Sequence, residues 1–348
     1  MYRWYRCAEV CYAHLWDVED GDNPHITNSQ FRRAEWFKRG WTLQELLAPN
    51  TVLFLSKTWA VIGTKHSLAK EIHDVTSIDT QILRGQRKLS DASVAERMSW
   101  ASDRVTTKVE DRAYCLVGIF GVHLMPLYGE GLHAFIRLQE AILGVIPDQS
   151  IFAWGQRRDS LLLSEPSPSA TALIASPGPL SDVDIRGQSW PYLLATSPKA
   201  FKGPIDISTI SRAQLSERLG VDVEYPRYAI TSYGMHMTLP TLPFSEDGSE
   251  GKELHLAFLA CQDKEGRLLA LILRRPRSPP SNSESIMHVG FCLPFQAQFR
   301  LSRPNLMASE IGDRYYRLAV LSQEQISACR TRILADRKVY VQHSLPLI

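Results

Sequence analysis

Hydrophobic and polar positions change their pattern partway along this chain of 348 residues. Before about Gly144, segments with apolar residues at helical spacing alternate with short apolar runs that are typical of buried strands. This alternation predicts an α/β front part. The expected strands are residues 10–15 and 51–55, and the longer expected helices are residues 1–9, 66–76, 93–101, 111–120 and 131–143.

From about Tyr228 the pattern becomes a series of short β-branched and apolar runs that glycines separate. Short strands at this spacing predict an antiparallel sandwich or barrel. The expected strands are residues 228–231, 235–239, 254–259, 268–273, 290–293, 315–321 and 339–342.

The connection between the two patterns is less regular. A strand is expected at residues 150–154, whereas residues 156–205 are rich in Pro, Ser and Ala, which is typical of linkers and surface loops. We therefore expect an α/β domain at residues 1–155, an irregular linker or insertion at 156–227 and a β-rich domain at 228–348.

A short helix that ends before Pro49 carries the most informative side chains. Trp41 and Glu45 are four residues apart, so an indole and a carboxylate share one helix face. In a structural interpretation, Glu45 pairs with an arginine and Trp41 fills the core. In a functional interpretation, Glu45 is a general acid/base or stabilises positive charge, with Trp41 as a stacking wall and Arg39 and Gln44 beside it. The chemistry of buried ion pairs favours the first interpretation, and both stay open.

A second polar cluster spans the junction between two expected helices. Glu110 and Asp111 stand at a helix N-terminus, where carboxylates complement the helix dipole, and Arg104 could clamp either of them. Gly121 follows this helix as a C-terminal cap, and Ser93 with Glu96 forms a capping-box pattern at the preceding helix. We interpret this cluster as a structural hinge network.

Composition excludes several classes of function. The hydrophobic content of 44%, the charged content of 22% and the net charge of +2 are ordinary, and indicate no nucleic-acid partner. The six cysteines lack a CxxC pair, so we expect no metal site and interpret Cys7 and Cys11 as reduced core thiols. No apolar run is long enough to span a membrane, which predicts a cytoplasmic protein. Nucleotide-binding, serine-hydrolase and zinc-protease motifs are missing.

Several segments, in order and at family-like spacing, resemble the HET (heterokaryon incompatibility) domain of filamentous fungi. The similarity covers residues 1–155. The matching segments are MYRWY with AEVCYA, WF with RGWTLQELLAP, SVAERMSWA, EDRAYCLVGIFGV, PLYGEG and AFIRLQE. The segment LLATSPKAF at residues 193–201 resembles the sequence that commonly follows the domain.

The chain departs from this family in two places. A strand resembling W-I-D-x-x-C-I-D is expected before residue 1, and residues 156–192 resemble an insertion. The resemblance therefore implies a truncated, TIR-like (flavodoxin-like) α/β domain whose sheet has an unpaired edge, followed by the sandwich- or barrel-like domain. Such an edge favours association.

The resemblance also implies a function in non-self recognition and regulated cell death. We expect an interaction module that self-associates or binds another death-signalling protein, with no cofactor. HET domains are similar to Toll/interleukin-1 receptor (TIR) domains, some of which cleave NAD. The alternative is therefore an NAD glycohydrolase in which Glu45 is catalytic and Trp41, Arg39 and Gln44 bind NAD as substrate. The incomplete N-terminal part would impair that activity. The β-rich half could sense a ligand or inhibit the front domain.

Overall fold

The computed structural model describes two compact units. Unit 1 comprises Met1–Ile146 with Thr196–Ile205, and unit 2 comprises Pro147–Ala195 with Asp206–Ile348. Within these bounds, the structure describes residues 1–155, 157–158, 193–203, 207–231, 234–245, 253–274, 286–289, 291–293, 314–316 and 318–341.

Unit 1 contains a three-stranded sheet in the order β1-β2-β3. Strand β1 (Cys11–His14) runs parallel to β2 (Val52–Leu55), and β3 (Val61–Thr64) returns antiparallel to β2. Alternate residues of a strand point to opposite faces, so Ala13 and Phe54, which are paired across the sheet, share the buried face. Phe54 packs edge-on against Phe31 and Trp36, at ring-centroid distances of 5.3 and 5.5 Å. This aromatic cluster is the core beneath the sheet.

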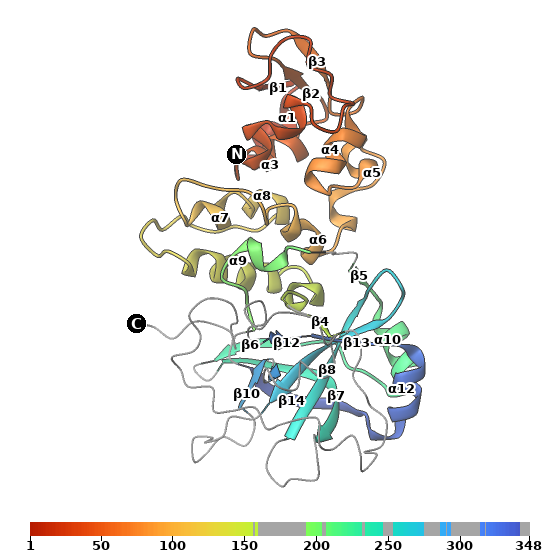
Figure 1. Cartoon of the computed structure of the whole chain (residues 1–348). Helices are drawn as coiled ribbons and strands as arrows, with labels where there is room; N and C mark the ends of the chain where they lie inside the picture. The colour runs from red at the N-terminus through yellow and green to blue at the C-terminus, as the bar shows by residue number, and fades with distance from the viewer. Residues whose placement is uncertain are drawn as a thin grey trace. The chain divides into compact units, whose positions relative to one another are not determined.

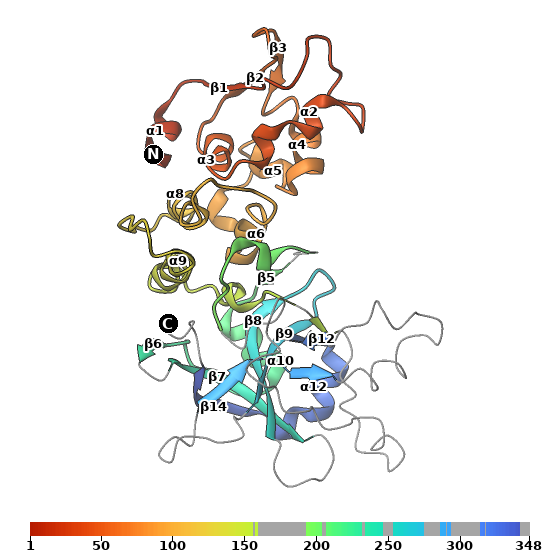
Figure 2. The same ribbon diagram turned by 60° about the vertical axis from the view of Figure 1, so that its left-hand side comes forward.

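Short helices make up the rest of unit 1, and α1, α3 and α4 lie on the same side of the sheet (Figures 1 and 2). The α-helices are α1 (Tyr2–Cys7), α2 (Gln30–Arg33), α3 (Thr42–Leu47), α4 (Ala69–Thr76), α5 (Thr80–Leu83), α6 (Val94–Ser99), α7 (Asp111–Tyr114), α8 (Val117–Phe120) and α9 (His133–Leu143). The 3₁₀ helices are η1 (Glu35–Lys38), η2 (Leu89–Asp91) and η5 (Pro198–Phe201).

Two expected helix ends are confirmed. Ser93 caps α6 because its hydroxyl accepts the amide hydrogen of Glu96. Gly121 ends α8 with a φ of +66°, the left-handed conformation that favours glycine. The single helix expected at residues 111–120 is wrong, since the chain forms α7 and α8 with a break at Cys115 and Leu116.

Unit 2 is built on a nine-stranded sheet. Strand β7 pairs β8, β8 pairs β9, β9 pairs β10, β10 pairs β14, and β14 pairs β7 again, so the backbone pairings close on themselves. Whether this sheet belongs with barrels or sandwiches stays a prediction. The strands are β4 (Arg157–Arg158), β5 (Ser208–Thr209), β6 (Tyr228–Thr231), β7 (Gly234–Ser245), β8 (Glu253–Gln262), β9 (Leu268–Arg274), β10 (Ile286–Val289), β13 (Leu318–Leu321) and β14 (Leu334–Val341), with β11 (Phe291–Leu293) and β12 (Arg314–Tyr316) as a separate pair.

Two helices of unit 2 were not expected from the sequence. Helix α10 (Arg212–Leu219) begins with a capping box of Ser211 and Gln214, and α12 (Gln323–Cys329) begins with one of Ser322 and Gln325. Leucines and isoleucines of both helices join the buried side chains of β8, β9 and β13 in one core cluster. The segment expected as an irregular linker, residues 156–227, includes the regular elements η5, β5 and α10 among its described residues.

The strand expected at residues 150–154 is also wrong. This segment starts as a 3₁₀ helix, η3 (Gln149–Phe152), because the Asp148 carboxylate accepts the amide hydrogen of Ser150 and turns the chain. Gln149 and Trp154 then bond to Ala260 and Leu193, which places the segment in unit 2. The boundary between the units therefore falls at Ile146, rather than at residue 155. The expected insertion at residues 156–192 lies almost wholly outside the described residues.

The expectation of an unpaired sheet edge concerns β1 and stays a prediction. Within the described residues β1 pairs with β2 alone, which leaves its other edge without a neighbouring strand. The TIR-like topology of unit 1 stays a prediction.

Candidate functional site

Helix α3 is positioned by the segment that precedes it. The amide of Gly40 donates to the carbonyl of Val105 at 2.9 Å, and a Cβ on Gly40 would lie 2.4 Å from Cγ2 of Thr106. Only glycine allows this close approach. The Thr42 hydroxyl lies 2.6 Å from the Trp36 carbonyl oxygen and 2.8 Å from that of Arg39. These contacts define where the helix starts.

Glu45 is half-buried on α3. Its Oε1 accepts a hydrogen bond from the Tyr5 hydroxyl at 3.1 Å, which joins the helix to α1. Burial, and then the charge of Glu45, raise the pKa of Tyr5 to about 12. Trp41 is half-buried and stands one helical turn before Glu45, directly before the first residue of α3. That the two side chains form one site stays a prediction.

Two further ionisable groups gather near Glu45. Burial raises the pKa of the half-buried Cys11 thiol, the charge of Glu45 raises it further, and Lys65 opposes both effects. Lys65 is 6% exposed and donates to the carbonyl oxygens of Leu46 and Pro49 at the end of α3. Burial lowers its pKa to about 8.

Sequence reasoning missed Tyr5 and Lys65, and it placed Cys11 in the core with Cys7, which is in fact exposed. Spacing gives no signal for these contacts, because Tyr5, Cys11, Glu45 and Lys65 lie on four separate elements or loops. Only folding brings the four groups together, so they could not be grouped from the sequence.

The other two predicted binding residues differ in position. Gln44 is 2% exposed, and its amide nitrogen donates to the carbonyl of Cys115 at 2.6 Å. Its side-chain oxygen is buried with no hydrogen-bond partner. Arg39 is exposed, and its carbonyl oxygen accepts hydrogen bonds from Thr42 and Arg104. Gln44 therefore belongs to the interior, which removes it from any surface that a substrate reaches.

Arg104 holds the start of α3 instead of clamping Glu110 or Asp111, so that expectation is wrong. Its Nη1 lies 2.9 Å from the Arg39 carbonyl oxygen and 3.0 Å from the Thr42 hydroxyl. Burial lowers its pKa to about 10, and its Nη2 is buried without a hydrogen-bond partner. The described hydrogen bonds of the guanidinium go to Trp100, Arg39 and Thr42, and none joins it to Glu110 or Asp111.

Glu110 and Asp111 organise the loop before α9. Oε1 of Glu110 accepts the amide hydrogens of Gly129 and Gly131 at 2.8 and 3.2 Å. A hydrogen bond from its own backbone amide, and then these two, lower the pKa of Glu110. Oδ1 of Asp111 accepts from the Tyr128 hydroxyl at 2.9 Å. The cluster is therefore structural, as the sequence suggests, although its partners differ.

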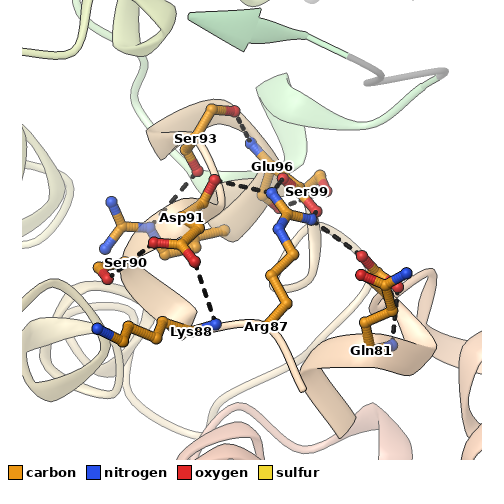
Figure 3. Close-up of polar contacts among 10 residues, drawn as sticks. Gln81, Arg87, Lys88, Ser90, Asp91, Ser93, Glu96 and Ser99 are labelled. Carbon is orange, nitrogen blue, oxygen red and sulfur yellow. Dashed lines mark hydrogen bonds and ion pairs between the residues drawn. The ribbon is translucent and has the colours of Figure 1, made fainter. Parts of the chain in front are cut away.

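A separate polar network joins α5, η2 and α6 (Figure 3). Arg87 is central, with Nη1 3.0 Å from Asp79, Nη2 3.3 Å from Glu96 and Nη2 2.7 Å from the carbonyl of Asp91. Glu96 therefore bonds to Arg87 while its amide is capped by Ser93. Because Arg87, Asp79 and Glu96 all have charged partners, we interpret this network as structural.

Two cavities outside α3 have polar walls. One of about 730 Å³ lies in unit 1 and is lined by His25, Thr27, Arg32, Arg33, Lys70, Glu71, Asp74 and Val75. One of about 430 Å³ lies in unit 2, between α10 and α12. Neither includes Glu45 or Trp41.

In the part of the chain that the structure describes, no group of three His, Cys, Asp or Glu side chains could hold a metal ion. No described helix has the length and apolar content needed to cross a membrane.

Comparison with known proteins finds a similar protein and a matching family model. The chain is 50% identical over 147 residues to the vegetative incompatibility protein HET-E-1 of Podospora anserina. This match covers 41% of the chain but spans only 11% of the relative's length. No solved structure matches the chain significantly. A sequence model described as "Domain of unknown function (DUF8212)" matches residues 133–345. Because that match includes more than half of the chain, the chain belongs to the DUF8212 family.

Proposed function

We propose that the chain acts in vegetative incompatibility, as an interaction module in the signalling that follows recognition of non-self and leads to regulated cell death. The observation that carries this proposal is the 50% identity over 147 residues to a vegetative incompatibility protein. The module works by association, either with copies of itself or with another death-signalling protein.

The contacts around α3 support a module without catalysis. Gln44 and Arg104 are engaged with backbone carbonyl groups inside unit 1, and Lys65 binds the carbonyls at the end of α3. These polar groups tie α3 to the segments around it and engage the side chains that the sequence offers near Glu45. We infer that the polar residues near α3 maintain the shape of a binding surface.

The proposal is tested by inducible expression of the chain in hyphae of a filamentous fungus. We expect growth arrest and loss of membrane integrity in the induced hyphae. The control is Phe54→Asp, which places a charge in the fully buried aromatic cluster and prevents folding. Normal growth at a confirmed level of folded wild-type protein would contradict the proposal.

A second candidate function is hydrolysis of NAD at the bond between ribose and nicotinamide. It is supported by the environment of Glu45, which is half-buried and forms no ion pair within the described residues. A carboxylate in that state can stabilise the positive charge that develops on the sugar as nicotinamide leaves. Trp41, on the same helix face, would stack on a ring of the substrate.

This alternative is tested by incubating the purified chain at high concentration with NAD and measuring free nicotinamide. Glu45→Gln keeps the shape of the side chain and removes its charge. Glu35→Gln is the matched control, because Glu35 is exposed and pairs with Lys38. Release of nicotinamide that is lost only in Glu45→Gln would support the enzyme, and no release from a chain extended upstream to the full length of the domain would exclude it.

A further inference from the structure

The open cavity of about 730 Å³ in unit 1 is lined almost entirely by charged and polar side chains. It lies where residues 25–27 and helix α2 meet α4, and the two helices lie side by side (Figure 2). Its volume is typical of small-molecule sites, which are usually mostly apolar. Among the described residues of this lining, however, only Val75 is aliphatic. The cavity therefore suits a small and strongly polar ligand.

The core of unit 1 fixes the walls of this cavity. Each helix is anchored by a fully buried side chain, Phe31 in α2 and Ile72 in α4. Ser29 caps α2, because its hydroxyl accepts the amide hydrogen of Arg32 at 3.3 Å. Neighbouring side chains of a helix point in different directions, so the arginines after Phe31 and the charged residues around Ile72 line the cavity. The positions of these charged groups therefore follow from buried contacts.

Two polar contacts join the loop and α2 to α4. Nη1 of Arg32 lies 2.8 Å from Oδ2 of Asp74, and Nδ1 of His25 lies 2.8 Å from Oε1 of Glu71. Burial opposes the ionisation of Glu71, but hydrogen bonds from His25 and from its own amide, with the charges of His25 and Arg32, lower its pKa. An ionised carboxylate only accepts hydrogen bonds, so Nδ1 of His25 carries the hydrogen and Nε2 is an acceptor when the ring is neutral.

Two cations of the lining have no carboxylate partner within the described residues. Arg33 is exposed and donates through Nε to the Ser29 carbonyl at 3.3 Å, and its two Nη atoms form no described hydrogen bond. Lys70 is exposed and forms no described ion pair. The hydrogen bond from Arg32, and less strongly the charge of Lys70, lower the pKa of Asp74. Arg33 and Lys70 are therefore available to an anion that enters the cavity.

The lining as a whole has a small positive charge. Its two arginines and one lysine outnumber Glu71 and Asp74 by one charge when His25 is neutral. Asp22 and His73, the other titratable side chains of α2, α4 and residues 22–29, lie outside the lining and bond to backbone groups. A phosphate monoester carries a charge of about −1.5 to −2 at pH 7. One such group suits this balance, whereas the two carboxylates repel a ligand with several phosphates.

We propose that this cavity binds a small sugar phosphate. Its phosphate monoester binds Arg33 and Lys70, because guanidinium and ammonium groups are the usual phosphate partners in proteins. Its hydroxyl groups donate to Oδ1 of Asp74 and Nε2 of His25, which form no hydrogen bond within the described residues. The inference goes beyond the proposed function and does not depend on it, because it concerns a small molecule rather than association.

The test is isothermal titration calorimetry of the full chain with glucose 6-phosphate and with ribose 5-phosphate. We expect the dissociation constant of at least one to rise about tenfold or more when Arg33 and Lys70 are both replaced by glutamine. The matched control replaces Lys38 and Lys57 by glutamine, since both are exposed, lie outside the cavity and remove the same charge. We expect it to change the dissociation constant less than about twofold. Circular dichroism confirms that both double variants are folded.

Inorganic phosphate and free glucose test the two parts of the proposed ligand. We expect each to bind about tenfold or more weakly than the sugar phosphate. Asp74→Ala should reduce the preference for the sugar phosphate over inorganic phosphate, because it removes a hydroxyl acceptor and frees Arg32.

Three results would overturn the inference. The first is that the folded wild-type chain binds neither sugar phosphate at millimolar concentration. The second is that both double variants weaken binding equally. The third is that inorganic phosphate binds with the same dissociation constant as the sugar phosphates, which would leave only a nonspecific anion site.

Discussion

The Tyr5 hydroxyl donates a hydrogen bond to Oε1 of Glu45 over 3.1 Å and so joins two helices that are 40 residues apart in sequence. The Glu45 carboxylate, the main candidate site group in the sequence, is therefore held by α1. This contact decides how Glu45 can act, because a carboxylate with a fixed donor is oriented even in the absence of a substrate.

Replacing Tyr5 with phenylalanine removes this hydrogen bond and little else. A hydrogen bond to a charged group contributes about 1.5–3 kcal/mol where it is buried, and less at this half-exposed position. We predict that Tyr5→Phe lowers the free energy of unfolding by about 1 kcal/mol, measured by urea denaturation at pH 7. An unchanged free energy would show that the contact is not formed in solution.

The same tyrosine predicts a loss of stability at high pH. Its pKa is raised to about 12 in the folded chain, from the ordinary tyrosine value of 10.0. Between those values the unfolded chain releases the proton first, so stability is complete below pH 10 and falls as the pH rises toward 12. Urea denaturation at pH 9 and pH 11 should show a smaller decrease for Tyr5→Phe than for the wild type. Equal decreases would contradict the assignment.

Lys65 predicts that stability rises with pH, and does so in a lower pH range than that of Tyr5. Burial lowers its pKa to about 8, so between pH 8 and 10.5 the unfolded chain binds more protons than the folded one. We predict that its contribution to stability rises over this range. The measurement is the difference in unfolding free energy between the wild type and Lys65→Met at pH 7.5 and pH 9.5. A difference that does not change with pH would show that Lys65 is solvated.

Gly118 is expected to control the docking of α1. A Cβ at this position would lie 2.2 Å from Cβ of Tyr2. Gly118→Ala should therefore displace α1 and lower stability by about 1–3 kcal/mol, with faster amide hydrogen exchange in residues 2–7. Gly144→Ala is the control, because its nearest neighbour would be 3.6 Å away. Equal exchange of α1 in both variants would contradict this packing.

Local sequence patterns predicted the elements whose positions depend on hydrophobic spacing and capping residues. Strands β1 and β2 lie within the runs expected at residues 10–15 and 51–55, and the ends of α6 and α8 follow from Ser93 and Gly121. The position of Trp41 one turn before Glu45 also follows from spacing alone. The capping boxes at Ser211 and Ser322 were equally readable, and α10 and α12 could have been predicted from them.

Tertiary contacts determine the elements and side-chain positions that local sequence patterns did not predict. The apolar run at Ile151 and Phe152 fits a strand or a buried helix equally well, and the Asp148 cap selects the 3₁₀ helix. Gln44 lies beside Glu45 in sequence, yet it points into the core because Cys115 supplies a carbonyl acceptor there. No periodicity places Tyr5 or Lys65 near α3. Such contacts depend on the whole fold, so a single sequence does not specify them.

Fungal growth arrest by the Glu45→Gln variant tests most directly whether the chain acts by association. We predict that Glu45→Gln arrests hyphal growth as strongly as the wild type at equal abundance, because the Glu45 charge has no role in docking. If the folded variant permitted normal growth while the wild type arrested it, the interaction account would be contradicted, and chemistry at this carboxylate would be required.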